Sequence, residues 1–103
     1  MNSRIDLQSK LEAILGSRNV YFQPPESLQM NYPAFVYDLA DIMTDKADNV
    51  NYIKNHRYTL TLIHKNPDNE LKETILDEFT HISFDRFYAK DGLNHYVYDL
   101  YYD

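Results

Sequence analysis

The chain has 103 residues, 44% of them hydrophobic, with a formal net charge of −6 and no cysteine. This length predicts one domain, residues 1–103, whose core needs no disulfide. The composition excludes a thiolate nucleophile and a cysteine metal site. It also argues against binding of duplex DNA as a main function, because contacts with the phosphate backbone require clustered Lys and Arg. No apolar run approaches the roughly 20 residues of a membrane span, and the N-terminal stretch lacks the apolar middle of a signal peptide. We therefore expect a cytoplasmic origin and no membrane partner.

The first third of the chain predicts one helix and two strands. The stretch SRIDLQSKLEAILG has helical apolar spacing and ends at Gly16, a residue suited to a left-handed C-terminal cap. Its apolar stripe consists of Leu7, Leu11, Ile14 and Leu15. A short strand in NVYFQPP is expected to stop at Pro24, because proline cannot donate to a sheet ladder. The run AFVYDLADIM after Pro33 predicts the second strand.

Residues 41–55 are polar and show no clean period. They predict either a long polar loop or a hairpin whose tip lies near Asp48 and Asn49. Loops longer than about 12 residues in a small domain are usually functional or disordered. We therefore regard this segment as a candidate for one interaction face.

The remainder of the chain predicts a strand, a helix and a hairpin. In HRYTLTLIHKN the apolar residues alternate with Thr, as in a half-buried strand. The stretch NPDNELKETILDEF returns to helical spacing, with Asp68 or Asn69 as its cap. Asp91-Gly92 suits a type I′ turn, so the two flanking runs are expected to be antiparallel neighbours. In the second run, one face carries Tyr96, Tyr98, Leu100 and Tyr102, and the other carries His95, Val97, Asp99 and Tyr101. We expect the first set in the core and the second set on the more exposed or subunit-facing side.

These elements follow the order α-β-β-β-α-β-β. The simplest packing is an α+β fold with an antiparallel β-sheet. We expect the N-terminal helix and the one internal helix to pack on one face of that sheet.

No catalytic or metal-binding pattern stands out in the sequence. The four histidines, His56, His64, His81 and His95, lack the spacing of a ligand pair on a helix. The ladder Asp38, Asp41, Asp45 and Asp48 lacks the glycine and terminal Glu of an EF-hand loop. With two glycines there is no phosphate-cradling loop. We predict a protein that is not an enzyme, with no catalytic residue, cofactor or metal. A small His/Asp-based enzyme or ligand-binding domain, with a pocket lined by His64 or His95, stays open as an alternative.

The remaining signals are those of an interaction protein. Ten tyrosines can supply large contact area at low entropic cost. Tyr alternates with Asp near the C-terminus, which disfavours stacking on single-stranded nucleic acid. Both charge signs occur in or beside residues 41–55, where they could set the register between subunits or simply solvate a hairpin. The candidate interface residues are Asp45, Lys46, Asp48, Tyr52, Lys54, Arg57, Arg86 and Tyr101. For Arg86, an ion pair and an edge position with a solvated head group are equally open.

Several short motifs between residues 30 and 102 occur together in one known family. They are Tyr32-Pro33, Ala47-Asp48-Asn49, Arg57-Tyr58-Thr59-Leu60-Thr61, Asn66-Pro67-Asp68, Phe84-Asp85-Arg86 and Leu93-Asn94-His95. In this pattern the chain resembles the small tail completion, or tail terminator, proteins of long-tailed bacteriophages. The N-terminal helix fits that family only by position, and none of the motifs is a catalytic fingerprint.

The resemblance implies a virion protein at the head–tail interface, made in the host bacterial cytoplasm. Such proteins form a hexameric ring on the tail tube, where they stop tube polymerisation and provide the surface that docks to the head. The implied partners are further copies of the chain, the tail tube protein and head–tail connector proteins. DNA passes through the lumen without specific binding, and an acidic wall would let it slide. Another connector component, an adaptor or a stopper, is the alternative within the same class.

Overall fold

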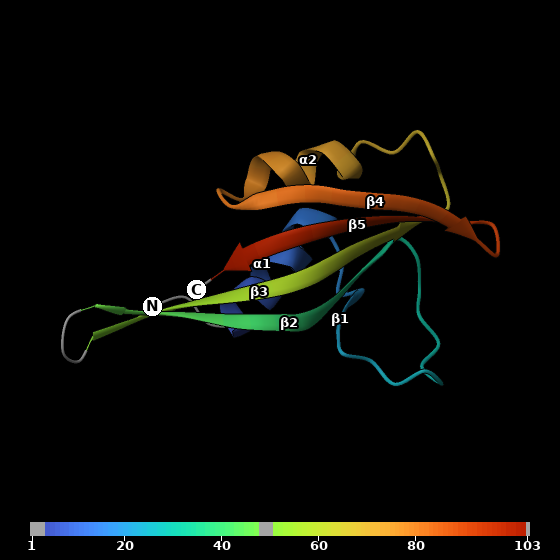
Figure 1. Ribbon diagram of the computed structural model, residues 1–103. Helices are drawn as coiled ribbons and strands as arrows, with labels where there is room; N and C mark the ends of the chain where they lie inside the picture. The colour runs from blue at the N-terminus through green and yellow to red at the C-terminus, as the bar shows by residue number, and fades with distance from the viewer. Residues whose placement is uncertain (1–3, 48–50, 103) are drawn as a thin grey trace.

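The computed structural model describes residues 4–47 and 51–102. Its elements are α1 (Arg4–Leu15), β1 (Val20–Phe22), β2 (Ala34–Ala47), β3 (Asn51–His64), α2 (Leu71–Glu78), β4 (Ile82–Lys90) and β5 (Leu93–Tyr102). This order confirms the predicted α-β-β-β-α-β-β sequence of an α+β fold (Figure 1). Neither helix in the described part of the chain is long and apolar enough to cross a membrane.

The five strands form one mixed sheet in the order β1-β2-β3-β5-β4. Three of its pairs are antiparallel, as expected, but β1 pairs in parallel with the start of β2, with Val20 opposite Phe35. The expectation of a wholly antiparallel sheet is corrected in this detail. The chain between β1 and β2 crosses back before β2 begins, so the two strands run in the same direction, as parallel pairing requires.

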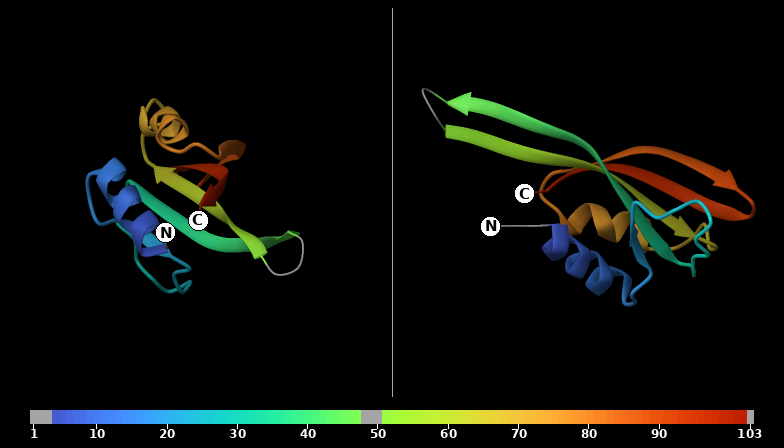
Figure 2. Two further views of the ribbon diagram at one scale, coloured as in Figure 1. Left: turned by 90° about the vertical axis from the view of Figure 1, so that its left-hand side faces the viewer. Right: turned by 90° about the horizontal axis from the view of Figure 1, so that it is seen from below.

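The core lies between the sheet and the two helices, which cover the same face of the sheet (Figure 2). Strand alternation brings Tyr58, Leu60 and Leu62 of β3 to this face, and α1 contributes Leu7 and Leu11. We call the opposite side of the sheet the open face. Because buried side chains from both helices and four strands meet on the helix face, the central strand β3 has little freedom to shift its register.

Local sequence signals account for both helix ends that were predicted. Gly16 has φ of 79° and its amide donates to the Glu12 carbonyl at 2.9 Å, which ends α1 in the left-handed geometry expected of glycine. At the start of α2 the side-chain oxygen of Asn69 accepts the Lys72 amide at 3.0 Å. Of the two predicted caps for α2, Asn69 is therefore the one used.

The β4–β5 hairpin turns at Asp91 and Gly92, whose φ angles are 55° and 74°. Positive φ at both positions confirms the predicted turn type. In β5, Tyr96, Tyr98 and Leu100 are buried as expected. Val97 is also buried, at 2% exposure, although its side was expected to be the more exposed one. Val97 is opposite Thr61 of β3 and Arg86 of β4, so neighbours on both flanking strands cover it.

The hydroxyl groups of two buried tyrosines donate hydrogen bonds to residues of the helices. The Tyr98 hydroxyl donates to the Lys72 carbonyl at 2.7 Å, and the Tyr37 hydroxyl donates to the side-chain carbonyl of Gln8 at 2.6 Å. Burial raises the pKa of both phenols above the ordinary value near 10, most strongly at Tyr98. Each bond ties a helix or its flank to the sheet.

Replacing Leu60 with Ala tests the central position of β3. Leu60 is fully buried, so its truncation should lower the free energy of unfolding by about 2–5 kcal/mol through lost burial and a residual cavity. The matched control is Leu28→Ala, at a leucine that is 39% exposed, which should change stability by less than about 0.5 kcal/mol. Urea unfolding of both variants measures the difference, and equal losses would contradict the placement of the core.

Tyr98→Phe gives a pH-dependent prediction. The pKa of Tyr98 is higher in the folded protein than in the unfolded chain. The phenol therefore contributes its full stabilisation below about pH 10, the pKa of an unfolded tyrosine, and this stabilisation is lost as the pH rises further. At pH 7 the variant should be about 1 kcal/mol less stable, because the Lys72 carbonyl loses its donor. Above pH 10 that gap should narrow, because the phenylalanine cannot ionise in the unfolded chain. Unfolding curves at pH 7 and pH 11 measure the gap, and a gap that widens at pH 11 would contradict the assignment.

Candidate functional site

The main irregular feature of the fold is a two-stranded arm at the ends of β2 and β3. These strands pair from Ala34 opposite Ile63 to Ala47 opposite Asn51. The neighbouring strand β5 accompanies β3 only from His64 back to His56. The rest of β3 therefore pairs with β2 alone, and the two strands extend away from the helices (Figures 1 and 2). The radius of gyration, 14.7 Å, accordingly exceeds the roughly 13 Å of a compact 100-residue domain.

The arm takes the place of the loop-or-hairpin segment predicted at residues 41–55. The backbones of Asp45 and Lys46 lie in β2, opposite Ile53 and Tyr52 of β3. Lys54 lies opposite Thr44 in the same ladder. The side chains of these candidate residues, and the whole of Asp48, lie outside the described residues. Their assignment to an interface stays a prediction.

Arg57 and Tyr101 are brought together on adjacent strands. They are direct register neighbours on β3 and β5, on the open face and near the base of the arm. The Arg57 guanidinium lies 3.5 Å from the Asp99 carboxylate, and about a third of each side chain is exposed. Asp41 of β2 is opposite Arg57 on its other side. A partly exposed ion pair at this distance adds at most about 1 kcal/mol to stability. Because about a third of each side chain is exposed, the charges of this pair stay accessible.

Arg86 lies apart from this cluster, on the edge strand β4. Its guanidinium contacts the carboxylate of its sequence neighbour Asp85 at 2.7 Å, and 63% of its side chain is exposed. Within the chain Arg86 thus pairs with Asp85 at the sheet edge and keeps a solvated head group, whereas its role as an ion-pair partner in a subunit contact stays a prediction. Of the candidate interface residues, the structure thus places Arg86 on one side of the molecule and the arm on the other (Figure 2).

The sequence did not single out the exposed aromatics of β4. Phe84, Phe87 and Tyr88 are 50%, 49% and 42% exposed. Each ring has one neighbour on β5, at centroid distances of 5.6 Å to Tyr98, 5.1 Å to Tyr96 and 4.5 Å to His95. The pattern in ISFDRFYAK predicts a strand but carries no sign of where that strand lies in the sheet. Exposed rings on an edge strand form a surface suited to protein contact.

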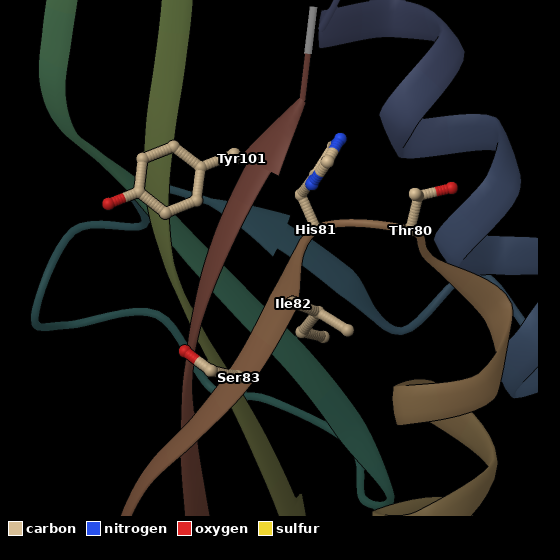
Figure 3. Close-up of a pocket in the computed structure, with 5 residues that line it drawn as sticks. All are labelled: Thr80, His81, Ile82, Ser83 and Tyr101. Carbon is tan, nitrogen blue, oxygen red and sulfur yellow. The ribbon is translucent and has the colours of Figure 1, made fainter.

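A shallow pocket of 330 Å³ lies where β4 begins beside the end of β5, lined by Thr80, His81, Ile82, Ser83 and Tyr101. The Tyr101 amide donates to the His81 carbonyl at 2.9 Å, which joins the two segments. The Tyr101 and His81 rings lie on opposite sides of this junction, and the five side chains do not converge on one point (Figure 3). This geometry does not assemble a nucleophile, a base and an orienting group.

The histidines considered for a ligand site have structural roles. The His64 ring accepts the Asn66 amide at 3.0 Å, and burial, followed by the charge of Lys72, lowers the pKa of His64. His95 stacks on Tyr88 with an interplanar angle of 11°. Within the described residues no group of three or more His, Asp or Glu side chains could hold a metal ion.

The comparisons with known proteins do not narrow these possibilities. A scan against protein-family models matches none of them, and a search of curated proteins finds no relative.

Proposed function

We propose that the chain is a structural assembly protein of a bacteriophage tail. In this role it caps the tail tube and forms part of the head–tail joining interface as a ring, without catalysis. The proposal starts from the resemblance of residues 30–102 to tail terminator proteins. Its partners are further copies of the chain, the tail tube protein and the connector proteins.

The single observation that carries the proposal is the pair of unlike surfaces at the two sides of the sheet. A ring of identical subunits is built by a head-to-tail contact, which needs two different surfaces on each copy. The arm of β2 and β3 offers one and the aromatic edge of β4 offers the other. Two such surfaces on one short chain suit a ring subunit better than a monomeric binding domain.

The positions of the family motifs add support. Tyr32-Pro33 directly precedes β2, and Asn66-Pro67-Asp68 precedes α2. Leu93-Asn94-His95 begins β5 after the hairpin turn. Motifs at the boundaries of elements determine where turns form and where strands begin. They are therefore consistent with a fold shared with the tail terminator proteins and do not indicate a catalytic role.

The charge of the chain fits passage of DNA through a lumen. A net charge of −6 disfavours adhesion of a phosphate backbone. Of the acidic residues, Asp45 lies in the arm and Asp41 at its base. An acidic inner wall would let DNA slide past without sequence-specific contact.

Deletion of the gene from the phage that encodes it tests the proposal. Without a terminator, tube polymerisation has no stop, so electron micrographs should show abnormally long tails. Complementation with the intact gene is the control and should restore the normal length. Tails of normal length on particles that fail to join would contradict the terminator role and favour an adaptor or a stopper.

A double charge reversal, Asp45→Lys with Asp48→Lys, tests the role of the arm. It should reduce the yield of infectious particles at least about tenfold, while the folded domain unfolds at an unchanged temperature, because the arm lies away from the core. The matched control is Asp77→Lys with Glu78→Lys at the exposed C-terminal end of α2, where cations suit the helix dipole. Plaque counts and thermal unfolding are the measurements. Full infectivity of the arm variant would show that these carboxylates have no part in assembly.

A further inference from the structure

Several strand edges of the described sheet have no strand partner, among them the outer side of β1 and the end of β3 beyond His56. Two longer open edges, of similar length, belong to β4 and β2. Strand β4 is nine residues long and pairs only with β5, so its other edge is open. Strand β1 pairs with β2 only from Phe35 to Tyr37, so β2 has no strand partner on that side beyond Tyr37 among the described residues. The side chain of Gln23 accepts the Leu39 amide at 3.3 Å, so the unpaired stretch of β2 begins after Leu39. Unpaired strand edges are templates for pairing with another chain.

The open edges of β2 and β4 each contain a regular stretch that follows a bulge. In β2 the register shifts between Leu39 and Asp41, and Asp41–Ala47 then pairs without irregularity, beginning with the five residues Asp41–Asp45. In β4 the register shifts between Phe84 and Arg86, and Arg86–Lys90 then runs without irregularity. Bulges end or redirect pairing at sheet edges, so they limit the part of each edge that a further strand can join.

The charges of these two stretches are complementary at both ends. The stretch Arg86–Lys90 has a cation at its first and last residues, and Asp41–Asp45 has a carboxylate at its first and last residues. When the stretches are paired over their full length, each cation is opposite a carboxylate, whether the strands run parallel or antiparallel. The middle residues, Tyr88 and Met43, are opposite each other in both directions. Direct cross-strand pairs of opposite charge stabilise a ladder, whereas like charges destabilise it.

Exposed apolar side chains occur beside these charges on both edges. On β2, Ile42 is 48% exposed, and on β4 Phe87 and Tyr88 are about half exposed. Pairing of the two stretches brings Ile42 next to Phe87, as a direct neighbour if the strands are parallel and a diagonal one if they are antiparallel. The charge pattern and the apolar pattern therefore select the same partner strand.

We infer that β4 of one copy pairs with Asp41–Asp45 of β2 in a second copy, continuing the sheet from subunit to subunit. The contact is head-to-tail, so each copy uses one edge on each side. Its closure into a ring rests on the proposed function, whereas the pairwise contact does not. A five-residue pairing is a small interface and is expected to be weak in one pair. It gains strength when ring closure makes the last contact intramolecular.

Disulfide trapping tests the pairing directly, because the natural chain has no cysteine. Two purified variants, Met43→Cys and an affinity-tagged Tyr88→Cys, are mixed at rising concentration and oxidised. Residues opposite each other in a ladder have Cα atoms about 5 Å apart, within the range that a disulfide spans. The mixed dimer should form several times faster than either like pair. The matched control replaces Met43→Cys by Thr59→Cys, on the central strand β3, and should give no excess of mixed dimer.

Charge exchange gives a second and independent readout. Arg86→Glu with Lys90→Glu, or Asp41→Lys with Asp45→Lys, sets like charges against each other at both ends. Each of these double substitutions should weaken association between copies at least about tenfold in sedimentation experiments. The four changes together restore opposite charges and leave the net charge at −6, because −4 on one edge is balanced by +4 on the other. Association of the fourfold variant should return to within about threefold of the natural chain.

The outcomes separate this inference from the proposed function. No excess of mixed dimer at any concentration would overturn the edge pairing. So would preferential trapping of Tyr88→Cys with itself, which indicates a β4–β4 contact. The edge pairing would also be overturned if the variant with all four charge changes associated as weakly as the two double variants. Normal tail length in the gene deletion would instead overturn the terminator role while leaving a trapped pair intact.

Discussion

The structure depends on unequal pairing of its central strand. Strand β3 pairs with β2 on one side from Asn51 to Ile63, but on the other side β5 reaches only as far as His56. Where both partners are present, alternation buries Tyr58, Leu60 and Leu62 under the two helices. Where β5 ends, β2 and β3 continue as a two-stranded arm, a structure that is only marginally stable by itself in water. The domain therefore combines a packed core with an extension that would gain stability from a partner.

The strand order distributes chemistry unevenly between the two sides of the sheet. The β4 edge carries half-exposed aromatic rings together with Arg86 and Lys90. The β2 edge carries Ile42 and the carboxylates of Asp41 and Asp45. Charges on an edge strand commonly protect it from aggregation. Here the spacing of the cations on one edge matches that of the carboxylates on the other, a coincidence that protection alone does not require. A self-complementary chain of this kind suits a protein that is built into a ring.

Local signals in the sequence predict most of the elements and the face of each strand. The left-handed cap at Gly16, the turn at Asp91-Gly92 and the alternation in β3 each follow from the conformational needs of a few neighbouring residues. The parallel direction of β1, the edge position of β4 and the burial of Val97 were not predictable in the same way. They depend on which distant segments pair, and no short stretch of sequence encodes that choice. The same limit applies to the candidate interface, where Arg57 and Tyr101 lie together on the inner strands β3 and β5 but Arg86 lies on the edge strand β4.

Amide hydrogen exchange on the assembled protein, compared with the dilute monomer, tests most directly whether the sheet continues between copies. Strand pairing would draw the outward-facing amides of both edges into hydrogen bonds, so exchange should slow together in Arg86–Lys90 and Asp41–Asp45. The amides of α1 and α2 should exchange at the same rate in both states, because both helices already cover the core. Protection confined to the helices, or assembly that leaves the β4 amides exchanging freely, would contradict the account.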